Sequence, residues 1–164
     1  MSDINRPIFL LGFGRSGTTW LSDITSKALG GLLLFEPLHP TVCDFAPEAC
    51  YATGWEPELA PRMRTYVDGI LSKADRRRWL LRNHLFTPLE EVSDAFVSML
   101  WDECEIIGFK DIRANFMIDW LIKHYDARIV YVVRHPCAVL ASVRRRLNFW
   151  KEFGWETHWR LFED

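Results

Sequence analysis

The sequence predicts an α/β protein with an open parallel sheet and helices on both faces. Short apolar runs, typical of buried strands, recur along the chain at Ile8–Leu11, Leu32–Phe35, Ile106–Phe109 and Arg128–Val133. Segments with apolar residues at helical spacing lie between these runs. Strands that alternate with helices pair in parallel, because each helix carries the chain back across the sheet.

The first unit of the chain gives the clearest local signals. Ile8–Leu11 runs into a glycine loop, and a helix over Thr18–Leu29 follows, with Gly30 as its carboxyl-terminal stop. Leu32–Phe35 forms the next strand, and Glu36 comes directly after it. A strand–helix–strand unit of this kind predicts that Glu36 stands beside the glycine loop.

The remaining elements follow from the same patterns. The stretch from His39 to Arg64 has no clear period and predicts a loop with short helices, of the kind that can cover a site. The sequence then predicts helices at Met63–Ala74, Leu89–Trp101 and Phe116–His124, a strand at Trp79–Arg82, and a last helix that starts at Pro136 and carries Val139, Leu140, Val143 and Leu147 on one face.

Composition limits the classes of partner. The 164 residues suit one domain, and 49% apolar with 26% charged residues are typical of a globular core. A formal net charge of −2 gives no global field, so neither nucleic acid nor a membrane is expected as a partner. We find no secretory leader and no apolar run of the roughly 18–20 residues that cross a membrane, and therefore expect a cytoplasmic protein.

Arginine and cysteine positions suggest ordinary structural roles. The arginine runs 76–78 and 144–146 are expected on solvated helix faces. The cysteines lack zinc spacing and are expected to be small hydrophobes in a reducing compartment: Cys43, Cys50, Cys104 and Cys137. No carboxylate cluster has metal-ligand spacing, so no metal is expected.

The glycine loop carries the strongest chemical signal. Residues 12–20 read GFGRSGTTW, close to the phosphate-binding pattern G-x-x-x-x-G-K-[S/T]. Thr18 stands where the triphosphate-binding loops have lysine, and Arg15 supplies a cation inside the loop. A glycine loop at a helix start presents backbone N–H groups to an anion. Without the lysine, the loop suits a smaller anion, such as one 5′-phosphate that carries a transferable group.

Three motifs together resemble those of sulfotransferases. Residues 14–20 resemble the 5′-phosphosulfate loop of that family, and residues 132–142 (VVRHPCAVLAS) resemble its 3′-phosphate motif. Phe35-Glu36-Pro37 is similar to a segment of the carbohydrate-type members. The matches occur in the family's order and span residues 7 to 146. The resemblance implies the sulfotransferase variant of the P-loop NTPase fold.

The resemblance also implies a donor and its ligands. The donor is 3′-phosphoadenosine 5′-phosphosulfate (PAPS), and the product is adenosine 3′,5′-bisphosphate (PAP). Arg15 stabilises charge on the departing 5′-phosphate. Trp20 stacks on adenine or, alternatively, is a core aromatic. The other implied ligands are Gly14, Ser16, Gly17, Thr18 and Thr19 for the 5′-phosphate, and Arg134 and Ser142 for the 3′-phosphate.

The acceptor must lose a proton as its oxygen attacks, which requires a base at the mouth of the sheet. Glu36 resembles the glutamate base of the carbohydrate-type members, with His39 and then His84 as alternatives. Lys110 and Arg113 reach the sulfuryl group or an anionic acceptor, or else form a solvated strand end. The segment after the second strand favours a carbohydrate or another small-molecule acceptor with a hydroxyl or amine.

Family members carry a further glycine-rich segment after the 3′-phosphate motif, so residues 1–164 are expected to form a single domain that is incomplete at its carboxyl terminus. Aromatic residues near that end are compatible with subunit contacts in a homo-oligomer. One rival is a non-catalytic relative that binds PAPS or PAP. The other is a divergent P-loop kinase that uses magnesium and Asp111.

Overall fold

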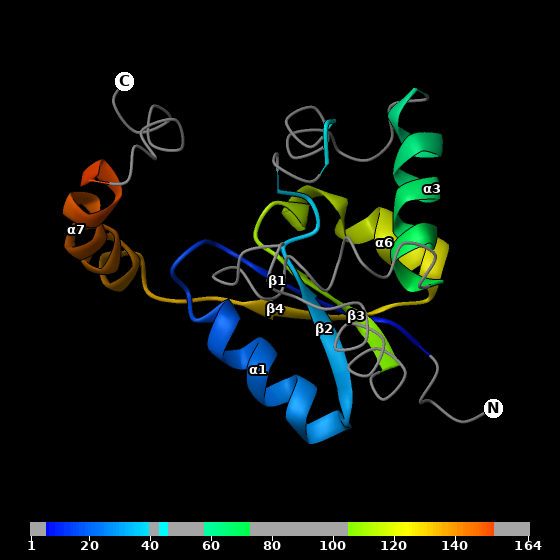
Figure 1. Cartoon of the computed structure of the whole chain (residues 1–164), viewed down its shortest axis with the longest axis horizontal. Helices are drawn as coiled ribbons and strands as arrows, with labels where there is room; N and C mark the ends of the chain where they lie inside the picture. Colours follow the sequence, from blue (N-terminus) through cyan, green and yellow to red (C-terminus); the bar gives the residue numbers. More distant parts are fainter. Residues whose placement is uncertain (1–5, 40–42, 46–57, 73–104, 153–164) are drawn as a thin grey trace, which may run out of the picture.

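The computed structural model describes residues 6–39, 43–45, 58–72 and 105–152 (Figure 1). Its strands are β1 (Ile8–Gly12), β2 (Gly31–Phe35), β3 (Glu105–Asp111) and β4 (Arg128–Val132). Its helices are α1 (Thr18–Leu29), α3 (Leu59–Leu71), the short 3₁₀ helix η3 (Ala114–Met117), α6 (Ile118–Tyr125) and α7 (Pro136–Glu152). The predicted strand Trp79–Arg82, the helix Leu89–Trp101 and His84 lie outside the described residues.

The strands form one parallel sheet in the order β2-β3-β1-β4. This confirms the predicted parallel α/β architecture. However, Glu36 does not stand beside the glycine loop, because β3 lies between β1 and β2. The crossover through α1 skips one strand position, which a later segment of the chain fills.

Helices cover both faces of the sheet, as the sequence predicts (Figure 1). Successive side chains of a strand point to opposite faces, so each strand contributes to two cores. Ile8, Leu10 and Leu33 lie on the face that Leu21 of α1 covers. Phe9, Leu34 and Phe109 lie on the other face, with residues of α3 and α6 that include Val67, Ile70, Trp120 and Leu121. No helix in the described ranges has the length and apolar character needed to cross a membrane.

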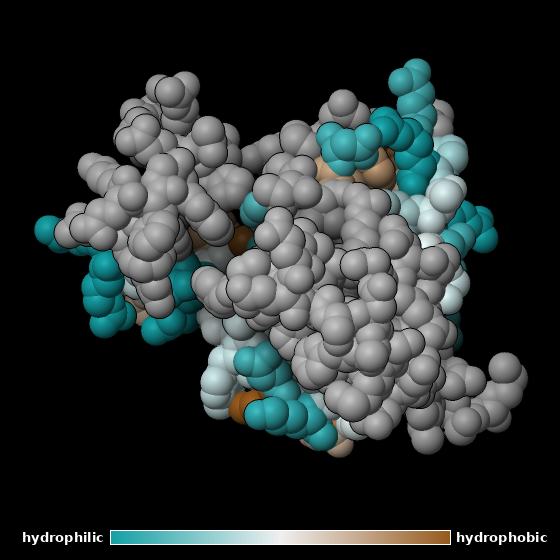
Figure 2. All heavy atoms as spheres, in the orientation of Figure 1, coloured by the Kyte–Doolittle hydropathy of each residue, from teal (hydrophilic) through white to brown (hydrophobic). Residues whose placement is uncertain are grey.

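Helix α7 starts at the carboxyl end of β4 and projects away from the sheet (Figure 1). Val139 is buried, whereas Leu140 is 62% exposed, so the predicted apolar face of this helix is only partly correct. Arg144 and Arg145 are exposed, as expected of a solvated helix face. The α7 atoms that can be seen at the outer edge of the molecule are mainly hydrophilic (Figure 2).

Two cysteines fall in the described ranges. Cys43 is buried in the core beside α3, as expected of a small hydrophobe. Cys137 is exposed at the start of α7, so the same expectation is wrong there, because this helix leaves the sheet instead of packing on it.

Gly108 controls the pairing of β3 with β1. Its φ is +147°, and a Cβ atom there would lie 1.8 Å from the backbone oxygen of Ile8. Gly108→Ala is therefore expected to destabilise the protein by more than about 3 kcal/mol in urea unfolding.

Gly69 in α3 is the matched control. A Cβ at Gly69 has no neighbour within 4 Å. Gly69→Ala is expected to stabilise the protein by about 0.5–1 kcal/mol. A Gly108→Ala variant that is as stable as the wild type would contradict the observed strand order.

Candidate anion-binding and catalytic site

The glycine loop connects the carboxyl end of β1 to the first turn of α1, as predicted. Arg15 and Gly17 both have a left-handed backbone, with φ of 66° and 97°, on either side of Ser16. The N–H of Ser16 donates to the carbonyl of Phe13 at 3.2 Å and closes the loop, and the first turn of α1 then presents N–H groups without intrahelical partners. The loop therefore has the backbone geometry of an anion site.

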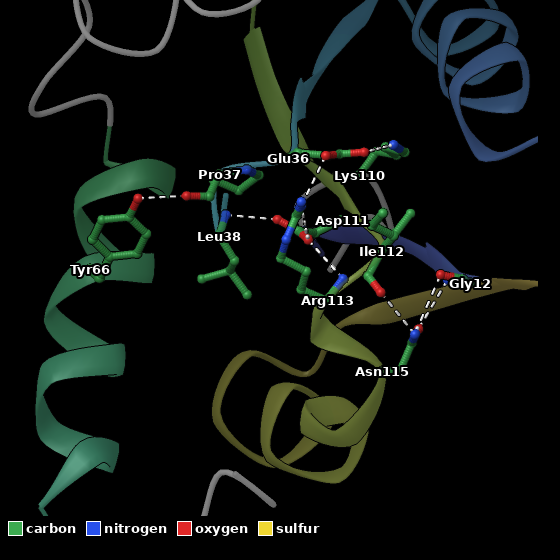
Figure 3. A network of polar contacts seen from close by, with 10 residues as sticks. All are labelled: Gly12, Glu36, Pro37, Leu38, Tyr66, Lys110, Asp111, Ile112, Arg113 and Asn115. Atoms are coloured by element: carbon green, nitrogen blue, oxygen red, sulfur yellow. Dashed lines mark hydrogen bonds and ion pairs between the residues drawn. The ribbon is translucent and has the colours of Figure 1, made fainter. Parts of the chain in front are cut away.

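Asn115 fixes the start of this loop (Figure 3). Its Oδ1 accepts the N–H of Gly12 at 3.1 Å, and its Nδ2 donates to the carbonyls of Gly12 at 3.4 Å and Ile112 at 2.9 Å. These bonds join the ends of β1 and β3. Asn115 is not among the site residues expected from the sequence, although an amide side chain shortly after a buried strand is a recognisable signal.

The two phosphate motifs meet in space. Nε of Arg15 donates to Oγ of Ser142 at 3.2 Å, across a separation of 127 residues. One guanidinium nitrogen of Arg134 donates to the backbone carbonyl of Arg15 at 3.1 Å. The pairing of β1 with β4 explains this contact, because Gly12 and Val132 are register partners at the carboxyl ends of their strands.

Side chains of the loop differ in exposure. Ser16 and Thr18 are 8% and 3% exposed, so they help to hold the loop against the sheet. Trp20 is 69% exposed, so its interpretation as a core aromatic of the first helix is wrong. A large exposed aromatic in the first turn of α1 is available to a flat ligand.

Buried charges gather at the neighbouring strand ends (Figure 3). Nζ of Lys110 donates to Oε1 of Glu36, and Arg113 donates to Oε2 of Glu36 at 2.9 Å. The side chains of Lys110 and Glu36 are only 2% and 12% exposed, and Lys110 also lies 4.2 Å from the centre of the Phe35 ring. The alternative that Lys110 belongs to a solvated strand end is therefore wrong.

These cations decide the charge of Glu36. Burial by itself raises the pKa of the Glu36 carboxyl, but the charge of Lys110 and the hydrogen bonds from Lys110 and Arg113 outweigh burial and lower it. Glu36 is consequently anionic at neutral pH. The same pairing reduces its affinity for a proton.

Asp111 positions the two turns that carry these groups. Its Oδ2 accepts the N–H of Leu38 at 2.7 Å, and its Oδ1 accepts the N–H of Arg113 at 2.8 Å. Burial raises the pKa of Asp111 to about 6, against the opposing charge of Arg113. The phenol of Tyr66 donates to the carbonyl of Pro37 at 2.7 Å and ties the turn after β2 to α3.

His39 lies on the same turn as Glu36. Its backbone N–H donates to the carbonyl of Glu36 at 3.1 Å. Both candidate bases that fall in the described ranges therefore follow β2 directly. Those ranges contain no group of three or more His, Cys, Asp or Glu that could hold a metal ion.

Comparisons with known proteins agree with these motifs. A model of the family described as "Sulfotransferase family" matches residues 7–163 of the chain. No curated protein and no solved structure gives a significant match.

The buried pair of Glu36 and Lys110 should be strongly coupled. Glu36→Gln leaves the Lys110 ammonium buried without its carboxylate, so it is expected to lower the free energy of unfolding by about 3–5 kcal/mol. The double variant Glu36→Gln/Lys110→Met is expected to lose about 1–3 kcal/mol less than the sum of the single losses. Urea unfolding of the wild type, Glu36→Gln, Lys110→Met and the double variant measures this coupling.

The exposed pair Arg6–Asp126 is the control, with side chains 40% and 80% exposed. Asp126→Asn should change stability by less than about 1 kcal/mol. If the stability lost in the double variant equals the sum of the losses in the Glu36 and Lys110 single variants, the buried pair does not act as a unit.

Asp111 should make stability depend on pH in an unusual direction. Because its pKa is raised from 3.8 to about 6 in the fold, the folded protein binds its proton more tightly than the unfolded chain. Lowering the pH from 7 to 4 is therefore expected to stabilise the wild type relative to Asp111→Asn, by up to about 3 kcal/mol. Chemical unfolding at several pH values tests this, and a constant difference between the two proteins would contradict the raised pKa.

Proposed function

Because the chain belongs to the sulfotransferase family, we propose that it transfers a sulfuryl group from PAPS to a hydroxyl or amine of a carbohydrate or another small molecule. The observation that carries this proposal is the contact between the two phosphate motifs. Arg15 of the glycine loop bonds to Ser142, and Arg134 bonds to the backbone of Arg15. One ligand with two phosphate groups would explain why both motifs belong at one place.

The residues present fit such a donor. The loop residues Ser16, Gly17, Thr18 and Thr19, with Gly14 leaving room for close approach, are proposed to hold the 5′-phosphate. The backbone N–H groups of residues 17–19 would do most of this, because that of Ser16 donates to the carbonyl of Phe13 at 3.2 Å. Arg134 and Ser142 are proposed to hold the 3′-phosphate. The exposed Trp20 offers a ring face to the adenine.

When bound, PAPS supplies a sulfuryl group whose transfer leaves negative charge on the 5′-phosphate. Fixed N–H groups at the start of α1 and the Arg15 guanidinium stabilise that charge without having to reorganise. Lys110 and Arg113, at the end of β3, are proposed to face the oxygens of the transferred group. Their hold on Glu36 keeps them in place.

A base must accept the proton of the attacking group, and Glu36 is proposed for this role. Its lowered pKa keeps it unprotonated, which a base requires, but also makes it a weak base. His39 on the same turn is the alternative, because the imidazole of a neutral histidine can accept a proton.

The geometry of Asp111 disfavours a kinase. A P-loop kinase needs an acidic residue at a strand end to bind magnesium, and Asp111 has that position. Here its two carboxylate oxygens accept the N–H groups of Leu38 and Arg113, and the residue is fully buried. Magnesium would have to displace these bonds.

Calorimetric titration with PAP tests the proposed function. Wild-type protein is expected to bind PAP without magnesium and more tightly than ATP with magnesium. Arg134→Ala should weaken PAP binding by about 10–100-fold, because it removes a charge-assisted bond to a phosphate.

Arg144→Ala is the control, since it removes the same charge from an exposed position on α7. It should change PAP affinity by less than about threefold. Preference for ATP with magnesium would refute the proposal and favour a kinase. PAP binding without sulfuryl transfer to any of a panel of sugars, alcohols and amines would favour a non-catalytic relative.

A further inference from the structure

The two cations that hold Glu36 differ in their surroundings. Nζ of Lys110 donates to Oε1 of Glu36, and a guanidinium nitrogen of Arg113 donates to Oε2 at 2.9 Å (Figure 3). The side chain of Lys110 is only 2% exposed, whereas that of Arg113 is 15% exposed. Lys110 is therefore enclosed in the protein, and Arg113 is the partner of Glu36 that is open to an incoming ligand.

The turn that carries Glu36 is held independently of Arg113. The φ of Glu36 is 44°, a left-handed conformation that a residue with a side chain keeps only where its surroundings impose it. The N–H of Glu36 donates to the carbonyl of Lys110 at 2.7 Å, and the N–H of Leu38 donates to Oδ2 of Asp111 at 2.7 Å. These bonds keep the carboxylate in place when the long side chain of Arg113 changes its direction.

The guanidinium group of Arg113 suits a second anion. The backbone N–H of Arg113 donates to Oδ1 of Asp111 at 2.8 Å, so the start of this side chain is fixed at the sheet edge. A guanidinium group has five N–H donors in one plane and can bond to two oxygens of one oxyanion. Arg113 can therefore leave one anionic partner for another without becoming an unpaired charge.

We propose that Arg113 is a catalytic residue that changes its partner during the reaction. In the protein without ligand it holds Oε2 of Glu36; when the donor binds, it bonds to the oxygens of the transferred group and leaves Oε2 to accept the proton. This inference rests on the proposed function. Oε2 takes the proton of the acceptor while the acceptor oxygen or nitrogen bonds to sulfur. The bond between sulfur and the bridging oxygen of the 5′-phosphate breaks, and its electron pair leaves with PAP.

This exchange reconciles two opposing demands on Glu36. While Arg113 and Lys110 both hold the carboxylate, its pKa is lowered and it is a weak base. Loss of the bond from Arg113 makes Glu36 a stronger base only when the donor is in place. Lys110 continues to hold Oε1 and keeps the carboxylate oriented.

The carboxyl group of Glu36 can be observed directly by NMR in protein made with glutamate labelled at its carboxyl carbon. This separates Glu36 from Asp111 and His39, the other titratable groups on these two turns, and the signal of Glu36 is identified by its absence in Glu36→Asp. The protein is first saturated with PAP, which occupies the glycine loop, and inorganic sulfate is then added in place of the transferred group. Sulfate is expected to raise the pKa of Glu36, with an acid dissociation constant about tenfold lower.

Substitutions of Arg113 test the exchange itself. Arg113→Ala should raise the pKa of Glu36 already without sulfate and should remove most of the response to sulfate. Arg113→Lys keeps the charge and should retain part of the response, which provides a second test if Arg113→Ala is unstable. Arg144→Ala, at an exposed position on α7, is the control and should respond to sulfate as the wild type does.

A Glu36 carboxyl that titrates identically with and without sulfate in the PAP complex would overturn the inference. An equal response to sulfate in the wild type and in Arg113→Ala would also overturn it, because the response would not depend on Arg113. A wild-type protein that binds no PAP would instead refute the proposed function on which the inference rests.

Discussion

Parallel pairing of β1 with β3 on one side and β4 on the other is the constraint on which the candidate site depends. It brings the carboxyl ends of all strands to one edge of the sheet, where open α/β proteins bind ligands. Arg15 and Ser142, which are far apart in sequence, therefore follow the neighbouring strands β1 and β4, whereas Glu36 follows β2 on the other side of β3. The close pairing of β1 with β3 also requires a residue without a side chain at position 108, because Gly108 lies against the backbone of Ile8.

Buried charge at this edge imposes a second condition. Lys110, Asp111 and Glu36 are all largely removed from water, and each is held by an ion pair or by backbone N–H groups. Such pairing orients the cations but conflicts with a basic role for Glu36, because it lowers the pKa of that carboxyl. An anionic group bound beside Lys110 and Arg113 would share their charge and raise the pKa again. Ligand binding and proton acceptance would thereby be linked.

Features that depend on neighbouring residues were predicted better than features that depend on contacts between distant segments. The bounds of α1 and the stop at Gly30 follow from helical spacing and a glycine, and both agree with the structure. The position of β3 between β1 and β2 could not be predicted, since strand order depends on contacts between distant segments. For the same reason the burial of Lys110 and the anchoring role of Asn115 were missed, and the sequence could not decide whether Trp20 is exposed or a core aromatic. The phosphate motifs could be found in the sequence because the residues of each motif are contiguous. The contact between the two motifs could not be predicted, because it depends on how the chain folds.

A crystal structure of the protein grown with PAP would show directly whether one ligand joins the two phosphate motifs. We expect one PAP molecule across the ends of β1 and β4, with its 5′-phosphate on the N–H groups of residues 17–19 and beside Arg15. Its 3′-phosphate should contact Ser142 and the guanidinium group of Arg134. A bisphosphate bound elsewhere, or one whose 5′-phosphate occupies the Ser142 position, would contradict the proposed site.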